Sequence, residues 1–169
     1  MAPLSEDDVA DVYRRYFPML LRKSRRMLHS PNDAQDLAQE AFLRLWQSRL
    51  DLRDVVATTA WLYRTCTRLA LDRLRSGVPP VVSAADATDA ISSGVASTED
   101  STHHRRLLEA LVSVLPRAEV EAAVLSRVDG LNHREIGEVL QINERTVRRL
   151  LARADARIAA WRARHEVVA

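Results

Sequence analysis

Residues 131–158 read LNHREIGEVLQINERTVRRLLARADARI. Asn132 followed by Glu135 is a capping-box pair, which predicts that a helix starts here. A short turn at residues 140–143 leads to a second helix, whose apolar residues recur at i, i+3, i+4, i+7 and i+11. These apolar residues are Val147, Leu150, Leu151, Ala154 and Ile158. Two short helices joined by a tight turn, the second strongly basic, form the helix-turn-helix pattern.

The second helix of this pair is the candidate DNA-reading element. Residues 143–164 hold seven arginines against two acidic residues. If the apolar stripe is turned inward, Arg145, Arg148 and Arg149 face outward in the first two turns of this helix. There they can neutralise phosphates or make bidentate hydrogen bonds to guanine. A solvated basic face would explain the charges equally well. The two capped helices and the turn between them favour the DNA-binding interpretation.

The remaining sequence predicts more helices. Towards the N-terminus from this pair, an apolar stripe begins near residue 105, Pro116 opens a helix, and Asp129-Gly130 ends it. The stripe consists of Leu107, Leu108, Leu111 and Leu115. Apolar residues also recur at a period near 3.6 between residues 9 and 28, where Pro18 is expected to kink or split the helix.

Two further helices are expected in the N-terminal half. Asn32 with Gln35 predicts the start of one helix, and Thr58 or Thr59 is expected to cap another that runs from about residue 61 to 75. Between residues 76 and 104 the chain is rich in Ser, Ala, Gly and Pro without amphipathic periodicity, which is typical of a flexible linker. We therefore expect an all-α protein of two small helical domains.

Composition limits the function classes. The chain has 169 residues, of which 47% are apolar and 28% charged, so it can fold. No apolar run reaches the roughly 20 residues of a membrane helix, and the single cysteine excludes an internal disulfide framework. Both features favour a soluble, cytoplasmic protein. Of the 25 basic residues, only Lys23 is a lysine.

The helix at residues 61–75 carries a second basic surface. Arg64, Arg68 and Arg75 lie on one side, beside Trp61 and Tyr63. Arginines next to aromatic rings suit single-stranded nucleic acid, in which bases stack and phosphates are neutralised. The alternative for the aromatic residues is a place in the core, and we favour it for them.

The helix that follows residue 32 has one polar face. Its apolar side holds Ala34, Ala38, Ala41 and Leu45, and its opposite side holds Asp36, Gln39, Glu40, Leu43 and Gln47. Such a face is either the solvated side of an amphipathic helix or a surface that docks a protein.

Catalytic and metal-binding motifs are missing from the sequence. It contains no glycine-rich phosphate loop, nucleophile elbow or HExxH, and its histidines lack zinc-ligand spacing from Cys66. Cys66 is expected to be a small buried hydrophobic residue. We therefore expect no enzyme activity, no metal and no cofactor.

Three segments together resemble a known family. They are DAQDLAQEAFLRLWQ (residues 33–47), AWLYRTCTRLALDRLR (residues 60–75) and the stretch from Leu115 to Ile158. In this order, with a linker before the third, they resemble the extracytoplasmic-function (ECF) sigma factors of the sigma-70 family. The resemblance implies an alternative sigma factor, in which residues 1–75 are sigma region 2, residues 76–104 a linker and residues 105–169 sigma region 4.

The resemblance also implies partners: core RNA polymerase, promoter DNA and an anti-sigma factor. Region 2 would dock on the β′ coiled coil of the polymerase and capture the minus-10 element, and region 4 would read the minus-35 element and touch the β flap. The implied polymerase-binding residues are Asp36, Leu37, Gln39, Glu40, Leu43 and Trp46, and the implied minus-10 residues are Trp61, Arg64, Arg68 and Arg75. The implied minus-35 residues are Asn143, Glu144, Arg145, Thr146, Arg148, Arg149 and Arg153.

Three positions depart from the family pattern. Arg68 stands where the family often has Asn, and Arg145 stands where it has Gly, so the promoter sequence does not carry over. Gln141 occupies the turn position that is usually Gly, where a positive φ would cost about 1 kcal/mol. Two other functions compete with the sigma factor: a helix-turn-helix regulator that does not act as a sigma subunit, and a protein that sequesters a partner through the Asp36 face.

Overall fold

Helices make up the regular structure, as the alanine-, leucine- and arginine-rich sequence predicts. The computed structural model describes residues 6–28, 30–48, 50–77 and 108–165, and these ranges contain no strand. Its helices are α1 (Glu6–Met27), α2 (Pro31–Gln47), α3 (Val55–Gly77), α6 (Arg117–Arg127), α7 (His133–Leu140) and α8 (Glu144–His165). Residues 108–114 are also helical. Most of the expected linker, residues 78–104, and Leu107 of the predicted stripe lie outside the described residues.

The starts and interruptions of the N-terminal helices differ from the prediction. Pro18 lies inside α1 without splitting it, and the buried side chains of Tyr16 and Leu20 on either side anchor this stretch to the core. Ser30, rather than Asn32, caps α2, because its hydroxyl accepts a hydrogen bond from the Asp33 amide at 3.2 Å.

The third helix starts earlier than predicted. It begins at Val55, where the Asp54 carboxylate accepts a hydrogen bond from the Ala57 amide at 2.9 Å. Asp54 is therefore the capping residue. Thr58 and Thr59 lie inside the helix, and the Thr59 hydroxyl donates to the Val55 carbonyl instead of capping. The prediction that a threonine caps this helix is wrong.

The C-terminal helices start and stop where the sequence predicts. Pro116 directly precedes α6, and Gly130 has a φ of 71° just after that helix. The capping box of α7 is complete: the Glu135 amide donates to the Asn132 side chain at 3.0 Å, and the Asn132 amide donates to the Glu135 carboxylate at 2.8 Å. These reciprocal bonds satisfy two amides that the helix leaves unpaired.

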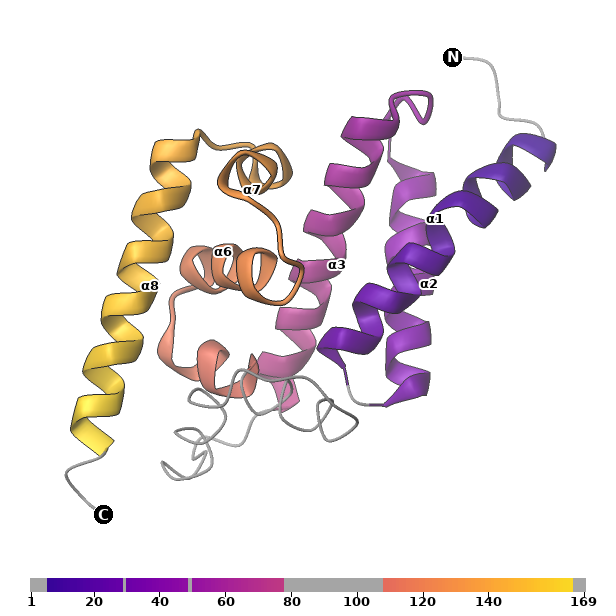
Figure 1. Cartoon of the computed structure of the whole chain (residues 1–169). Coiled ribbons are helices and arrows are strands. Elements are labelled where there is room, and N and C mark those ends of the chain that lie inside the picture. Colours follow the sequence, from indigo (N-terminus) through magenta and orange to yellow (C-terminus); the bar gives the residue numbers. More distant parts are fainter. Residues whose placement is uncertain (1–5, 29, 49, 78–107, 166–169) are drawn as a thin grey trace.

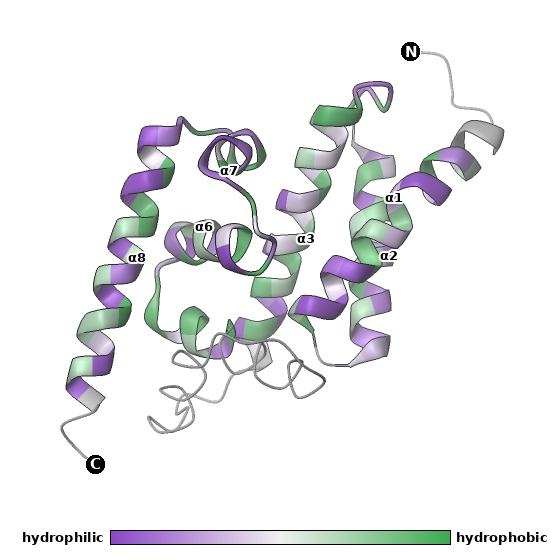
Figure 2. Ribbon diagram, in the orientation of Figure 1, coloured by the Kyte–Doolittle hydropathy of each residue, from purple (hydrophilic) through white to green (hydrophobic). Residues whose placement is uncertain are grey.

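The two halves of the chain pack against each other. Figure 1 shows α3 in the centre, with α1 and α2 on one side and α6, α7 and α8 on the other. The described helices alternate hydrophobic and hydrophilic positions (Figure 2), and α3 contacts both α6 and α7. One core cluster includes Leu37 and Leu62 from the first half together with Val120 and Val124 from the second. Apolar side chains from both halves of the chain therefore share one core.

Candidate nucleic-acid and protein interfaces

The helix-turn-helix consists of α7, residues 141–143 and α8. Gln141 adopts the left-handed conformation (φ 59°, ψ 45°), as anticipated for this turn position. The Ile142 amide donates to the Gly137 carbonyl at 3.0 Å, so the turn folds back over α7. A Cβ at Gly137 would lie 2.7 Å from the Ile142 carbonyl oxygen. Glycine is therefore needed at residue 137, where the backbone of the turn approaches α7 closely.

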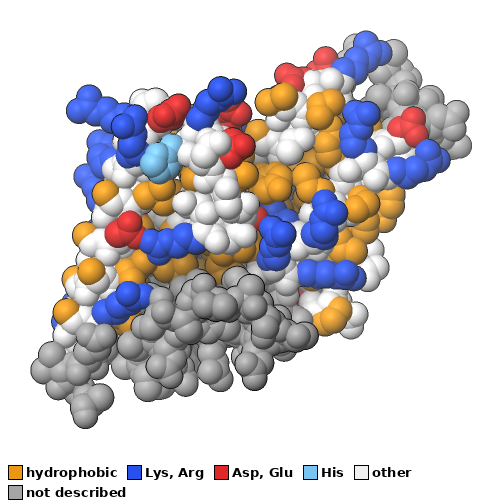
Figure 3. All heavy atoms as spheres, in the orientation of Figure 1, with side chains coloured by type: hydrophobic (Ala, Val, Ile, Leu, Met, Phe, Trp, Pro, Cys, Tyr) orange, Lys and Arg blue, Asp and Glu red, His pale blue; other side chains and the backbone are white. Residues whose placement is uncertain are grey.

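The start of α8 presents free arginines. Asn143 caps the helix, since its side-chain oxygen accepts a hydrogen bond from the Thr146 amide at 2.8 Å. Arg145, Arg148 and Arg149 are exposed, as are Glu144 and Arg153. None of these four arginines forms an ion pair with a described residue. Figure 3 shows basic side chains gathered at this end of the molecule.

The opposite face of α8 attaches it to α6. Val147, Ala154 and Ile158 are buried, as the sequence predicts. Further along the helix, Arg157 pairs with Glu119 of α6 at 3.0 Å, and Arg127 of α6 pairs with Asp155. These two arginines are therefore held by ion pairs within the protein, unlike the arginines at the start of α8.

The predicted minus-10 arginines on α3 lie in different surroundings. Arg68 is half-exposed, and its Nε lies 3.3 Å from the Glu121 carboxylate of α6. Arg64 is partly buried, and this burial together with the nearby Arg68 lowers the pKa of its guanidinium. Arg75 is also partly buried. The second half of the chain therefore neutralises part of this basic surface.

The aromatic residues of α3 are partly buried, in line with the core interpretation. Trp61 packs against the main core cluster. Tyr63 packs against a second cluster formed by Leu125, Ile136, Val139 and Val147. In this arrangement Tyr63 faces the helix-turn-helix half of the chain.

The predicted polymerase-binding residues divide into an exposed face and a core. Asp36 and Gln39 are exposed, and Leu43 and Trp46 expose 59% and 41% of their surface. Glu40 is partly exposed and binds Arg44 at 2.7 Å and Arg73 at 3.0 Å. Leu37 is fully buried, so the structure places it beneath this face rather than on it. The exposed members are called the α2 face below: Asp36, Gln39, Glu40, Leu43 and Trp46.

Three charged residues of the structure were missed by sequence reasoning. Lys23 of α1 is buried and pairs with Asp129, which follows α6. Glu121 of α6 is also buried, and it binds Arg117 at 3.0 Å as well as Arg68. The one feature of the sequence that distinguishes Lys23 is that it is the single lysine, since the other Lys and Arg positions are all arginine. A guanidinium is less strongly hydrated than an ammonium and is the more usual cation in a buried ion pair, so the sequence did not predict that this lysine is buried.

Other features of the described ranges do not point to chemistry. Cys66 is fully buried, and burial raises the pKa of its thiol. Within those ranges, His, Cys, Asp and Glu form no group of three or more that could hold a metal ion. Nor does any helix there combine the length and apolar character needed to cross a membrane.

Comparison with known proteins gives the class. Residues 12–78 match sigma-70 region 2, and residues 105–158 match sigma-70 region 4. The chain is 30% identical over 163 residues to the ECF RNA polymerase sigma factor SigW of Bacillus subtilis, an alignment that spans 85% of this chain and 82% of SigW. It is 28% identical over 159 residues to the ECF RNA polymerase sigma factor SigE of Mycolicibacterium smegmatis, covering 92% of this chain and 62% of SigE.

A third relative is the RNA polymerase sigma factor CarQ of Myxococcus xanthus, which is 30% identical over 141 residues, covering 82% of this chain and 80% of CarQ. Both regions and these relatives define a transcription initiation factor of the sigma-70 class. More narrowly, the chain belongs to the ECF RNA polymerase sigma factors, and it is an alternative sigma factor that directs transcription initiation. The match to region 2 favours the sigma factor over a helix-turn-helix regulator, since such a regulator needs only the second half of the chain.

Proposed function

We propose that the α2 face is the surface through which this sigma factor binds core RNA polymerase, on the β′ coiled coil. The observation that carries this proposal is the exposure of Leu43 and Trp46, which lie one turn apart on α2. Exposed apolar patches that polar residues surround are typical of protein-docking sites. Leu37 supports the face from below.

Promoter recognition is divided between the two halves of the chain in this proposal. Residues 1–75 bind polymerase and the minus-10 element, with Trp61, Arg64, Arg68 and Arg75 on α3 as its contacts. Residues 105–169 read the minus-35 element and touch the β flap. The free arginines at the start of α8 support this second assignment, because a recognition helix meets base edges with its N-terminal residues.

Within α8, the positions of the side chains suggest separate roles. Arg148 lies one turn beyond Glu144 on the outward face, and we assign it to a guanine. Arg149 and Arg153 are assigned to phosphates, and Asn143, Glu144, Arg145 and Thr146 complete the surface at the groove. The protein performs no chemistry of its own, acts in the cytoplasm with the polymerase, and is regulated by an anti-sigma factor.

Binding to core polymerase tests the α2 face. The variant that combines Asp36→Arg with Leu43→Asp reverses one charge and places a carboxylate on the apolar centre of the face. We expect it to lose co-elution with core RNA polymerase while its circular dichroism spectrum and thermal unfolding stay those of the wild type. A matched control is Asp51→Arg, which reverses an exposed charge in the loop between α2 and α3. Normal co-elution of the folded double variant would show that the dock lies elsewhere.

A further inference from the structure

Helix α1 carries a row of arginines that none of the sites described above includes. At about 100° per residue, Arg22 and Arg26 each lie within about 20° of Arg15 around the helix axis. All three side chains are exposed, and none forms an ion pair with a described residue. These three arginines are called the α1 basic face below, and they extend about 17 Å along the helix.

The sequence around this face lacks acidic partners. Between residues 12 and 32 it holds six Lys or Arg and no Asp or Glu. A solvated face commonly mixes both signs, because opposite charges one turn apart stabilise a helix. Arg22 and Arg26 instead place like charges one turn apart, which destabilises the helix. An anion bound across the two guanidinium groups removes this repulsion.

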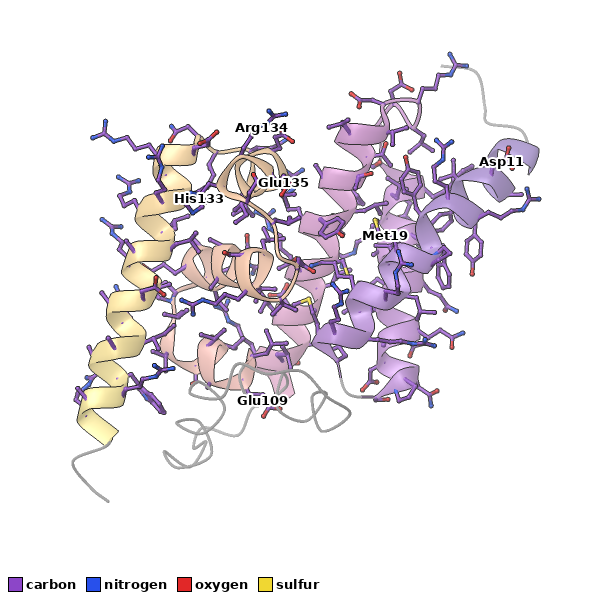
Figure 4. The ribbon with its side chains drawn as sticks, in the orientation of Figure 1. Asp11, Met19, Glu109, His133, Arg134 and Glu135 are labelled. Atoms are coloured by element: carbon purple, nitrogen blue, oxygen red, sulfur yellow. The ribbon has the colours of Figure 1, made fainter. Side chains whose placement is uncertain are left out.

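The α1 basic face borders helix α3. Burial and the nearby Asp129 raise the pKa of Tyr63 on α3, and the positive charges of Arg26 and Arg22 oppose this rise. Both arginines therefore lie close to the Tyr63 ring. Lys and Arg side chains gather over α1 and along its border with α3 (Figure 3), and Met19 lies on the side of α1 that faces α3 (Figure 4). An anion on the α1 basic face would thus lie beside the helix that we assign to the minus-10 element.

At its N-terminal end the face reaches a cavity between α1 and the loop before α3. The cavity has a volume of about 610 Å³ and is lined by Arg15 and Arg53. Arg14 also lines it but pairs with Asp11 at 2.8 Å, whereas Arg53 forms no ion pair with a described residue. The Tyr16 side chain in this lining is 3% exposed, and its hydroxyl has no hydrogen-bond partner among the described residues. Unpaired guanidinium groups and an unsatisfied hydroxyl beside one cavity suit an anion that carries several oxygen atoms.

We propose that the α1 basic face binds the phosphate backbone of the single strand whose bases contact α3. This inference rests on the proposed role of α3 in binding the minus-10 strand. A strand in duplex geometry places one phosphate about every 3.4 Å, so a straight row of cations about 17 Å long can meet several of them. Phosphate contacts carry no sequence information. Helix α1 therefore adds affinity and fixes the position of the strand, whereas the choice of base stays with α3.

The test removes two charges from the face in the full-length protein. The variant combines Arg22→Gln with Arg26→Gln. The control combines Arg25→Gln with Arg44→Gln, which removes the same charge from exposed positions outside the face, on α1 and α2. Fluorescence anisotropy at several salt concentrations measures the binding of a mixed-sequence single-stranded DNA oligonucleotide, and the same sequence as a duplex provides the comparison.

We expect the variant to bind the single strand more weakly and to reduce the slope of log K against log salt by about 1.4 units, since each phosphate contact contributes about 0.7. The control should keep the wild-type slope. An unchanged slope in the variant overturns the proposal, and so does an equal reduction in the control, which would show an effect of net charge alone. A reduction seen only with the duplex overturns the assignment to a single strand.

A labelled polyglutamate peptide tests the competing acidic partner. If the variant lost binding to this peptide but kept its slope with DNA, the face would bind an acidic protein, and the proposal would be overturned. The circular dichroism spectrum and melting temperature of the variant should not fall below those of the wild type, because the substitutions remove like charges.

The single variant Arg15→Gln repeats the test one end of the face away from Arg22 and Arg26. It should reduce the single-strand slope by about 0.7 units, and an unchanged slope in this variant also overturns the proposal. Failure of the proposed function is measured separately. Wild-type protein would then give no promoter-specific transcription with core polymerase, whereas the salt slopes are measured without polymerase.

Discussion

The two halves of this sigma factor present different kinds of surface. Region 2 exposes an apolar and acidic face on α2, whereas the arginines of α3 that we assign to DNA are partly buried or paired with α6. Region 4 presents the opposite: the arginines at the start of α8 are exposed and unpaired with any described residue. Both helices carry a similar arginine pattern in the sequence. The difference between them arises from packing, which pairs or partly buries the arginines of α3 and leaves those at the start of α8 exposed.

The largest effect on stability is expected from a substitution in the core of region 2, and a substitution on the α2 face provides the comparison. Leu37→Ala removes a fully buried side chain and should lower the free energy of unfolding by about 2–5 kcal/mol. Leu43→Ala, two turns further along the same helix, should change stability by less than about 0.5 kcal/mol yet weaken polymerase binding. Urea unfolding and co-elution with core polymerase measure the two effects. Equal stability losses would place Leu43 in the core.

In region 4 the corresponding test concerns the turn of the helix-turn-helix. Gly137→Ala forces a methyl group against the Ile142 carbonyl, so the turn must shift. We expect a loss of about 1–3 kcal/mol in stability and weaker minus-35 binding, because α8 moves relative to α7. Gly130→Ala is the control: its φ of 71° strains the backbone, but no atom lies within 4 Å of the added carbon. DNA binding should survive that change.

The arginines of α8 give the next comparison. Arg148→Ala should weaken binding to a selected minus-35 element by about 1–3 kcal/mol and relax the preference at one base pair. Arg149→Ala and Arg153→Ala should weaken binding to all sequences alike and reduce the salt slope by about one unit. Titrations of the full-length variants at several salt concentrations distinguish these cases. If Arg148→Ala left affinity and base preference unchanged, this helix would not occupy the major groove as proposed.

The smallest effect concerns the left-handed turn residue. Gln141→Gly removes the penalty of a positive φ and should raise the free energy of unfolding by about 1 kcal/mol. Gln141→Ala keeps the strained backbone and serves as the control. Thermal unfolding of both variants measures the difference, and equal melting temperatures would show that the strain is negligible.

Local features of the fold could be predicted from the sequence. The Asn132–Glu135 capping box, the end of α6 near Gly130 and the buried stripe of α8 follow from short-range rules, and the structure confirms them. The errors at the starts of α2 and α3 arose because several polar residues competed for each cap. Ser30 precedes a proline that suits the first helical turn, and Asp54 directly precedes the β-branched Val55.

Long-range features of the candidate sites could not be predicted in this way. The pairing of Lys23 with Asp129 joins residues 106 positions apart, and no periodicity brings such residues together. For the same reason the sequence did not show that Glu121 binds Arg68. Leu37 was included in the docking face by family resemblance, whereas burial depends on how α2 packs in the core. Resemblance identifies the helix that carries a surface, and packing decides which of its residues are exposed.

Transcription with core RNA polymerase on a genomic DNA library is the most direct test of the central claim. With the wild-type protein, we expect new transcription starts, each preceded by shared minus-10 and minus-35 elements at a fixed spacing. The folded variant combining Asp36→Arg with Leu43→Asp should lose these starts. A pattern of starts no different from that of core polymerase alone would contradict the account.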